Sequence, residues 1–207
     1  MELILIRHAL PVRRELDEGI ADPELSPAGH AQARHLAEYL ASEPLDALYT
    51  SPMRRAVQTA EPLAVAKNLP ITVIDEVAEW DRNASEYIPL EELKAAGDPR
   101  WRTMAAGEFD FGEETPEQFR GRVVTALEAL VEAHPGQRVA VTCHGGVVNA
   151  YLANVLGLPV SPGFFFPNYT SIHRVAASRG GHRSIVTVNE TAHLRGTGLP
   201  MGVVQQS

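Results

Sequence analysis

The sequence predicts an α/β protein, a three-layer α/β/α sandwich built on a mostly parallel sheet. Short apolar runs rich in β-branched residues alternate with segments whose apolar residues recur at helical spacing, which is typical of strands joined by crossover helices. Serine–proline or threonine–proline pairs, which are good helix starts, precede several of the helical segments. The 207 residues, 44 % of them apolar and 21 % charged, are enough for one sizeable core.

The first half of the chain is predicted to form three strands and two helices. Residues 3–6 are a short apolar run that indicates a buried strand. Ser26 can cap a helix that has Pro27 at its first position, and apolar spacing continues this helix to Leu40. A second serine–proline pair, at 51–52, repeats the helix-start signal. The segments expected after the first helix are a strand at 46–50, a helix at 53–67 and a strand at 71–74.

The second half begins with an irregular segment, residues 79–114, which contains two prolines, both tryptophans and many charges. We expect it to be an insertion that includes a helix at 90–96. Thr115 and Gln118 have capping-box spacing, so a long helix should run from there to about His134. The segments expected to follow are a strand at 138–142, a helix at 145–156 and strands at 171–177 and 184–188. We expect a single domain over residues 1–195, followed by a loosely ordered tail at 196–207.

Composition restricts the classes of function and the location. A net charge of −8 disfavours nucleic acid as a partner. Cys143 is the one cysteine in the sequence, so no internal disulfide is expected. The apolar runs are too short for a signal peptide or a membrane span, so we expect a cytoplasmic protein with no membrane partner.

Polar residues gather where three predicted strands end. Arg7 and His8 end the first strand, residues 51–55 follow the second, and residues 142–146 join a later strand to a helix. Because parallel strands place their carboxyl ends at one edge of the sheet, these groups should converge. Guanidinium groups bind phosphate in a bidentate manner, and helix N-termini and glycine pairs present backbone N–H groups to anions. The sequence therefore predicts a site for a phosphoryl group.

The chemistry expected at this site needs no metal and no cofactor. The sequence has no GxxxxGK[ST] loop and no carboxylate-rich cluster that could hold Mg²⁺. A metal-free phosphoryl site needs a protein nucleophile, and histidine is one side chain that can serve. Nearby arginines would disfavour protonation of that histidine and stabilise charge on the phosphoryl oxygens. A carboxylic acid must protonate the leaving oxygen, and Glu79 is the best placed by topology.

The order of these motifs resembles the histidine phosphatase superfamily, also called phosphoglycerate mutase-like. The resemblance covers nearly the whole chain and implies a phosphoglycerate mutase-like fold. The matching segments are the strand that ends in Arg7-His8, LSPAGHAQA at 25–33, SPMRRAVQTA at 51–60, VTCHGG at 141–146, and a closing hairpin that comprises 168–175 and 189–194.

The resemblance implies which residues carry the reaction. His8 would be the nucleophile and would pass through a phosphohistidine. Glu79 would protonate the leaving group and later activate water. Glu76 and Asp81 are alternatives to Glu79, because the family motif around the acid is loose.

The resemblance also implies which residues bind the substrate phosphate. Arg7, Arg55 and His144 would hold it. Arg55 is preferred to Arg54 because the family arginine directly precedes an alanine, here Ala56.

The chain departs from the family pattern after His8. The family commonly continues with Gly-Glu, whereas residues 9–14 here read ALPVRR, and Arg14 stands where the family has an asparagine. A charge at Arg14 could bind a second substrate anion or replace an amide contact. The changes weigh against a mutase more than against a phosphatase, because a mutase must retain and reorient a doubly anionic intermediate.

We therefore expect a metal-independent phosphomonoester hydrolase that acts on a small phosphorylated substrate. One alternative is a phosphotransferase of the phosphoglycerate mutase type. Another is a binding module that kept the phosphate pocket without turnover. The sheet edges and the closing hairpin could support a homodimer.

Overall fold

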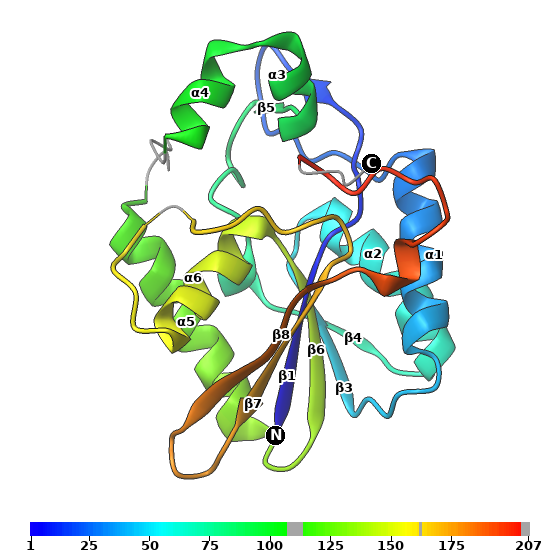
Figure 1. Cartoon of the computed structure of the whole chain (residues 1–207), viewed down its shortest axis with the longest axis vertical. Coiled ribbons are helices and arrows are strands. Elements are labelled where there is room, and N and C mark those ends of the chain that lie inside the picture. Colours follow the sequence, from blue (N-terminus) through cyan, green and yellow to red (C-terminus); the bar gives the residue numbers. More distant parts are fainter. Residues whose placement is uncertain (107–113, 162, 204–207) are drawn as a thin grey trace.

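The computed structural model describes residues 1–106, 114–161 and 163–203 (Figure 1). The strands of its central sheet are β1 (Glu2–Arg7), β3 (Ala47–Thr50), β4 (Ile71–Val73), β6 (Arg138–Cys143), β7 (Ile172–Ala177) and β8 (Arg183–Glu190). They lie in the order β4-β3-β6-β1-β7-β8. Strands β4, β3, β6 and β1 run parallel to one another, whereas β7 and β8 are antiparallel to their neighbours. The mostly parallel sheet is thereby confirmed.

Helices cover both faces of this sheet. The helices of the two outer layers are α1 (Pro27–Leu40), α2 (Arg54–Lys67), α5 (Pro116–Ala133) and α6 (Gly145–Val155). Leu3 and Leu5 of β1 belong to one buried cluster with residues of α5 and α6, whereas Ile4 and Ile6 belong to a second cluster with residues of α1 and α2. Successive side chains of a strand point to opposite faces, so residues 3–6 of β1 are all apolar because both faces are covered. The three-layer sandwich is confirmed (Figure 1).

Three helix starts were predicted from a serine or threonine that precedes a proline. Two of them form as the sequence predicts, and one does not. The Ser26 hydroxyl accepts a hydrogen bond from the Gly29 N–H, and Thr115 forms a capping box with Gln118. The expected cap at Ser51 was wrong. Helix α2 begins at Arg54, and Met53 is at its N-cap position. The Ser51 hydroxyl lies two residues earlier, where it accepts from the Met53 N–H and contacts a histidine that is described below.

The insertion lies over the carboxyl edge of the sheet (Figure 1). Its elements are β5 (Glu86–Tyr87), α3 (Leu90–Ala96) and α4 (Pro99–Ala105), after a short 3-10 helix at Asp75–Val77. Helix α3 has the bounds expected from the sequence. Strand β5 pairs with β2 (Arg14–Glu15), so the segment after β1 and the insertion form one small second sheet. Residues 107–113 of the expected insertion lie outside the described residues.

The C-terminal segment begins with a 3-10 helix at Ala192–Leu194 and then returns to the carboxyl edge of the sheet. The Tyr169 N–H donates to the Met201 carbonyl at 2.9 Å, and the Gln32 amide donates to the Pro200 carbonyl. Residues 196–203, which we expected to be loosely held, are therefore tied to the fold by hydrogen bonds. Residues 204–207 of the expected tail lie outside the described residues. No helix of the described chain has the length and apolarity that crossing a membrane would need.

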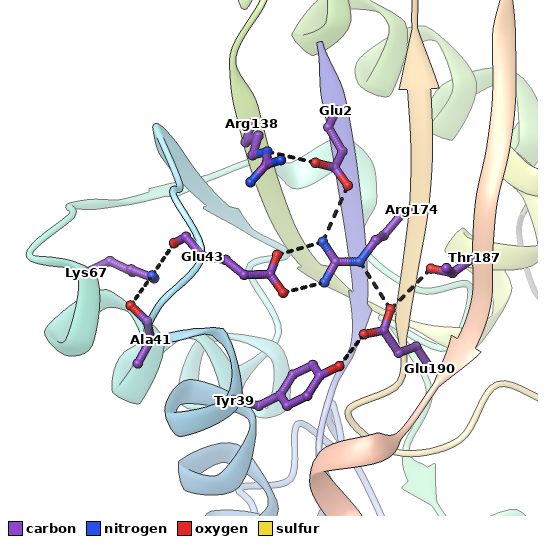
Figure 2. A network of polar contacts seen from close by, with 9 residues as sticks. All are labelled: Glu2, Tyr39, Ala41, Glu43, Lys67, Arg138, Arg174, Thr187 and Glu190. Atoms are coloured by element: carbon purple, nitrogen blue, oxygen red, sulfur yellow. Dashed lines mark hydrogen bonds and ion pairs between the residues drawn. The ribbon is translucent and has the colours of Figure 1, made fainter.

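A network of charged residues joins the sheet to α1 and to the segment that follows α1 (Figure 2). Arg174 of β7 is its centre, with its side chain only 11 % exposed. It forms a bidentate pair with Glu43, at 2.8 and 2.9 Å, and further pairs with Glu190 and Glu2. Tyr39 of α1 donates to the opposite carboxylate oxygen of Glu190 at 2.7 Å. One guanidinium thus links β1, β7, β8 and the segment after α1.

Replacing Arg174 by methionine should lower the free energy of unfolding by about 2–3 kcal/mol, because three partly buried carboxylates lose a hydrogen-bonding partner. Urea unfolding followed by circular dichroism measures this. The matched control is Arg138→Met, which removes one ion pair, to Glu2, from a side chain that is 42 % exposed. That change should cost less than about 1 kcal/mol. Equal stabilities of the two variants would contradict the structural role of Arg174.

Candidate active site

The order and register of the strands bring the predicted site residues together. Strands β3, β6 and β1 are neighbours, and Thr142 of β6 lies opposite both Thr50 of β3 and Ile6 of β1. The chain positions that follow these strands therefore meet at one edge of the sheet. His8 follows β1 and His144 follows β6, and the centres of the two imidazole rings are 5.2 Å apart.

His8 is buried and is held in one tautomer. Its Nδ1 lies 2.8 Å from the Ala9 carbonyl oxygen. A carbonyl can only accept, so Nδ1 carries the hydrogen and Nε2 keeps a free lone pair. Burial, followed by the positive charges of Arg55 and Arg7, holds the pKa of His8 well below its ordinary value. The ring is thus a neutral base with an available nitrogen, as a nucleophile requires.

Arg7 and Arg55 lie beside His8 and form a partly filled cradle. Both side chains are buried, at 8 % and 1 % exposure. Arg55 donates to Asp81 at 2.8 Å, and Arg7 donates to the Pro167 carbonyl at 2.5 Å. The buried Nε of Arg7 and the buried Nε and Nη1 of Arg55 have no hydrogen-bond partner in the described part of the chain. Buried N–H groups without partners are costly, so these donors fit an anion that completes the cradle.

Two tyrosines hold the guanidinium planes in place. The Arg7 Cζ lies 4.2 Å from the ring centre of Tyr169, and the Arg55 Cζ lies 4.7 Å from the ring centre of Tyr87. A cation over an aromatic face is stabilised, most strongly where water is excluded. These contacts hold both guanidinium groups in place while leaving the Nε of Arg7 and the Nε and Nη1 of Arg55 without a partner among the described residues.

His144 adds a further buried polar atom. Its Nε2 lies 2.7 Å from the Ser51 hydroxyl, which itself accepts from the Met53 N–H. The serine hydrogen can then be donated to Nε2, which leaves a hydrogen on Nδ1. This buried Nδ1 has no partner among the described residues. Burial, then Arg55 and His8, lower the pKa of His144, so the ring is a neutral donor.

Glu79, which follows the 3-10 helix at Asp75–Val77, is buried, and its carboxyl group lies beside the N-terminus of α6. It accepts from the Gly146 N–H at 2.7 Å and from the Trp80 N–H at 3.1 Å. Burial, and then the negative charge of Asp81, raise its pKa to about 7. A carboxyl with this pKa can give up and take back a proton near neutral pH, as a general acid and base must.

The structure separates Glu79 from the other acids considered. Glu76 is exposed, and Asp81 is engaged with Arg55. Arg54, which we did not expect to bind substrate, forms an ion pair with Glu24 at 2.7 Å on the surface. Arg14 pairs with β5 and does not belong to the described lining of the site.

One cavity of about 440 Å³ contains the groups that could react. Arg7, His8, Arg55, Glu79 and Gly146 line it together. The described residues contain no group of three or more histidine, cysteine, aspartate or glutamate side chains that could hold a metal ion. The arrangement can bind a tetrahedral anion, attack it with an imidazole nitrogen and protonate a leaving oxygen.

Comparison with known proteins gives the family. The family model described as the histidine phosphatase superfamily (branch 1) matches residues 3–191. The chain belongs to this superfamily. Among curated proteins, it is 32 % identical to phosphoserine phosphatase 1 of Hydrogenobacter thermophilus over 94 % of each chain. It is also 32 % identical to an uncharacterized phosphatase, PhoE, of Bacillus subtilis, over 68 % of each chain. The chain is thus a histidine phosphatase, as the motifs suggested.

Solved structures share the fold of this histidine phosphatase. A Bacillus stearothermophilus protein, YhfR, superposes with a TM-score of 0.76 at 22 % identity, over 94 % of this chain and 99 % of that one. A mutant phosphoserine phosphatase of Entamoeba histolytica in complex with phosphoserine gives a TM-score of 0.72 at 24 % identity, over 93 % and 98 %. The phosphoglycerate mutase-like architecture is confirmed.

Four residues have contacts in this site that their sequence pattern does not predict, namely Ser51, Asp81, Tyr87 and Tyr169. Ser51 lies inside a recognised motif, and its position after a strand was the available signal. Asp81 was considered only as an acid. Tyr87 and Tyr169 carried no motif, because each contacts an arginine that is distant along the chain.

Gly146→Ala should lower phosphatase activity by about 100-fold with the fold retained, since a Cβ there would overlap the Glu79 carboxylate and displace it. The control is Gly121→Ala in α5, where an added Cβ would meet nothing within 4 Å. Steady-state kinetics on both variants, with circular dichroism to verify folding, makes the comparison. Equal activities would show that the position of Glu79 does not matter.

Proposed function

We propose that this histidine phosphatase is a metal-independent phosphomonoester hydrolase that works through a phosphohistidine on His8. Arg7, Arg55 and His144 bind the substrate phosphate, and Glu79 is the general acid and base. The observation that carries the proposal is the set of buried N–H groups without partners around a neutral His8. Such donors match the oxygens of a phosphoryl group and the charge that develops on them during transfer.

In the first step, the lone pair of His8 Nε2 attacks phosphorus and the bond from phosphorus to the ester oxygen breaks. The proton on Glu79 moves to that oxygen, so the leaving group departs as a neutral alcohol. The pKa of Glu79, about 7, keeps a substantial fraction of the group protonated at neutral pH. Arg7 and Arg55 stabilise the negative charge on the transferred group.

In the second step, the Glu79 carboxylate takes a proton from water as the water oxygen attacks phosphorus. The bond between phosphorus and nitrogen breaks, and its electron pair returns to His8 Nε2. Inorganic phosphate leaves, and Glu79 is again protonated. The low pKa of His8 favours its departure as a neutral imidazole, without a proton from another group.

The substrates are small phosphorylated compounds, in keeping with the cavity and with relatives named as phosphoserine phosphatases. The alternative of a binding module without turnover finds no support in the site, because His8 and Glu79 are both in place. A cytoplasmic location and a homodimer stay predictions from the sequence.

The test compares wild type, His8→Ala and Glu79→Gln on p-nitrophenyl phosphate in EDTA. Wild type should release phosphate unchanged by EDTA, and His8→Ala should lose at least about 1,000-fold in rate. Glu79→Gln should accumulate an acid-labile phosphoenzyme, because p-nitrophenolate leaves with little acid help whereas hydrolysis still needs the base. Glu76→Gln, which alters an exposed carboxylate, is the matched control and should behave as wild type.

Two results would contradict this function. A His8→Ala protein that kept its phosphatase rate would remove the phosphohistidine. Transfer of the phosphoryl group to 3-phosphoglycerate faster than to water would make the protein a phosphotransferase of the mutase type.

A further inference from the structure

The cavity offers much more space than the phosphate cradle needs. Its volume of about 440 Å³ falls within the range of about 300–1,000 Å³ of pockets that enclose whole small molecules. Beyond the cradle, its lining comes from the insertion over the sheet edge, from residues 163–167, from the start of α6 and from Val203. Six apolar side chains of this lining, called the apolar wall below, are Ile88, Leu93, Met104, Phe164, Phe165 and Phe166.

The backbone of the segment that carries the three phenylalanines is anchored beside the cradle. Asn149 of α6 donates to the carbonyls of Gly145 and Phe165 and accepts from the Phe164 N–H at 2.9 Å. Arg7 donates to the carbonyl of Pro167, the next residue after these phenylalanines. The aromatic part of the wall is therefore built in place before any substrate binds, which lowers the entropic cost of binding.

The insertion supports the same wall from the other side. The ring of Phe166 lies against Trp101 of α4, with ring centres 5.7 Å apart. Leu93 of α3 is buried at 4 % exposure. The apolar wall is thus shared between two segments that are distant in sequence.

In the described lining, the cation that lies outside the phosphate cradle is already paired with carboxylates. Besides Arg7 and Arg55, the described lining contains one further cation, Arg100. Its Nε and Nη2 donate to Asp98 at 3.0 and 2.8 Å, and its Nη1 donates to Glu86 at 2.7 Å. The residues outside the described ranges include no lysine, arginine or histidine in the sequence. A substrate carboxylate in this cavity would meet apolar surface and the acid Glu86.

We propose that the substrates are phosphomonoesters of uncharged apolar alcohols, aryl or longer alkyl, whose alcohol part packs on the apolar wall. The proposal rests on the proposed function and deepens it. Phosphomonoesters that carry a carboxylate, such as amino-acid or sugar-acid phosphates, are disfavoured. The reason is that burying a charge without a partner costs more than the contacts return. Each methylene or ring that enters such a pocket adds about tenfold or more to kcat/KM.

The experiment measures kcat/KM of the whole protein for 2-phenylethyl phosphate, ethyl phosphate and O-phosphoserine, all of which release an alkyl alcohol. We expect 2-phenylethyl phosphate to exceed both of the others by about tenfold or more. Phosphoserine equal to or better than 2-phenylethyl phosphate would overturn the inference. Turnover without preference would also overturn it while leaving the phosphatase intact. Phosphate release from none of the three, nor from p-nitrophenyl phosphate, would overturn the proposed function itself.

Two variants test whether the apolar wall causes the preference for an apolar alcohol. Phe166→Ala should lower the ratio of kcat/KM for 2-phenylethyl phosphate over ethyl phosphate by about fivefold or more. This ratio does not depend on how much of the sample is folded. Leu156→Ala, which shortens an apolar side chain that is 52 % exposed and outside the described lining, is the control and should keep the wild-type ratio. An unchanged ratio in Phe166→Ala would show that the apolar wall does not select the alcohol.

The double variant Arg100→Met with Glu86→Gln tests the opposite interpretation, in which Arg100 leaves its carboxylates to bind a substrate carboxylate. Glu86→Gln is included because Glu86 lines the cavity and, without Arg100, its charge would itself repel a substrate carboxylate. The proposal expects the ratio of kcat/KM for phosphoserine over ethyl phosphate not to fall below its wild-type value in this double variant. A selective loss for phosphoserine would assign Arg100 to substrate binding and overturn the proposal.

Discussion

The site depends on positive charge that is buried and only partly paired. Arg7 and Arg55 lie together next to His8, and Asp81 neutralises one of the two guanidinium charges. Leaving buried N–H groups unpaired is expensive, and the fold must supply the stability that pays for it. The buried charge of these two arginines has two consequences. The unpaired donors attract a phosphoryl group, and the same charges hold the pKa of His8 low, so that its Nε2 stays free.

The architecture provides this arrangement through strand order rather than through any single motif. Neighbouring strands β3, β6 and β1 end at the same edge, so residues from three distant segments become first neighbours. The cores on both faces of the sheet keep these ends in register, and the Arg174 network ties α1 to the antiparallel strands (Figure 2). Helix α6 then presents the Gly146 N–H to Glu79, which couples the acid to the same sheet edge.

Much of this could be read from the sequence, because it depends on local patterns. The apolar runs predicted the strands of the central sheet, and the cap signals at Ser26 and Thr115 predicted the starts of α1 and α5. What the sequence did not yield depends on contacts between distant segments. No pattern relates Tyr87 to Arg55, and the helix after Ser51 begins only at Arg54, so the Ser51 hydroxyl does not cap it and contacts His144. A local rule failed there at the site itself, where polar groups serve the chemistry rather than the helix.

The most direct test of the account is the ionisation state of His8 in the ligand-free protein. Nitrogen NMR of the imidazole rings, with His8→Ala used to assign the signal, reports both protonation and tautomer. An ordinary histidine, with a pKa of about 6.5, is mostly protonated at about pH 6. Because burial and two arginines lower the pKa of His8, its ring should be neutral at that pH, with the hydrogen on Nδ1. A protonated ring at that pH, or a hydrogen on Nε2, would contradict the account.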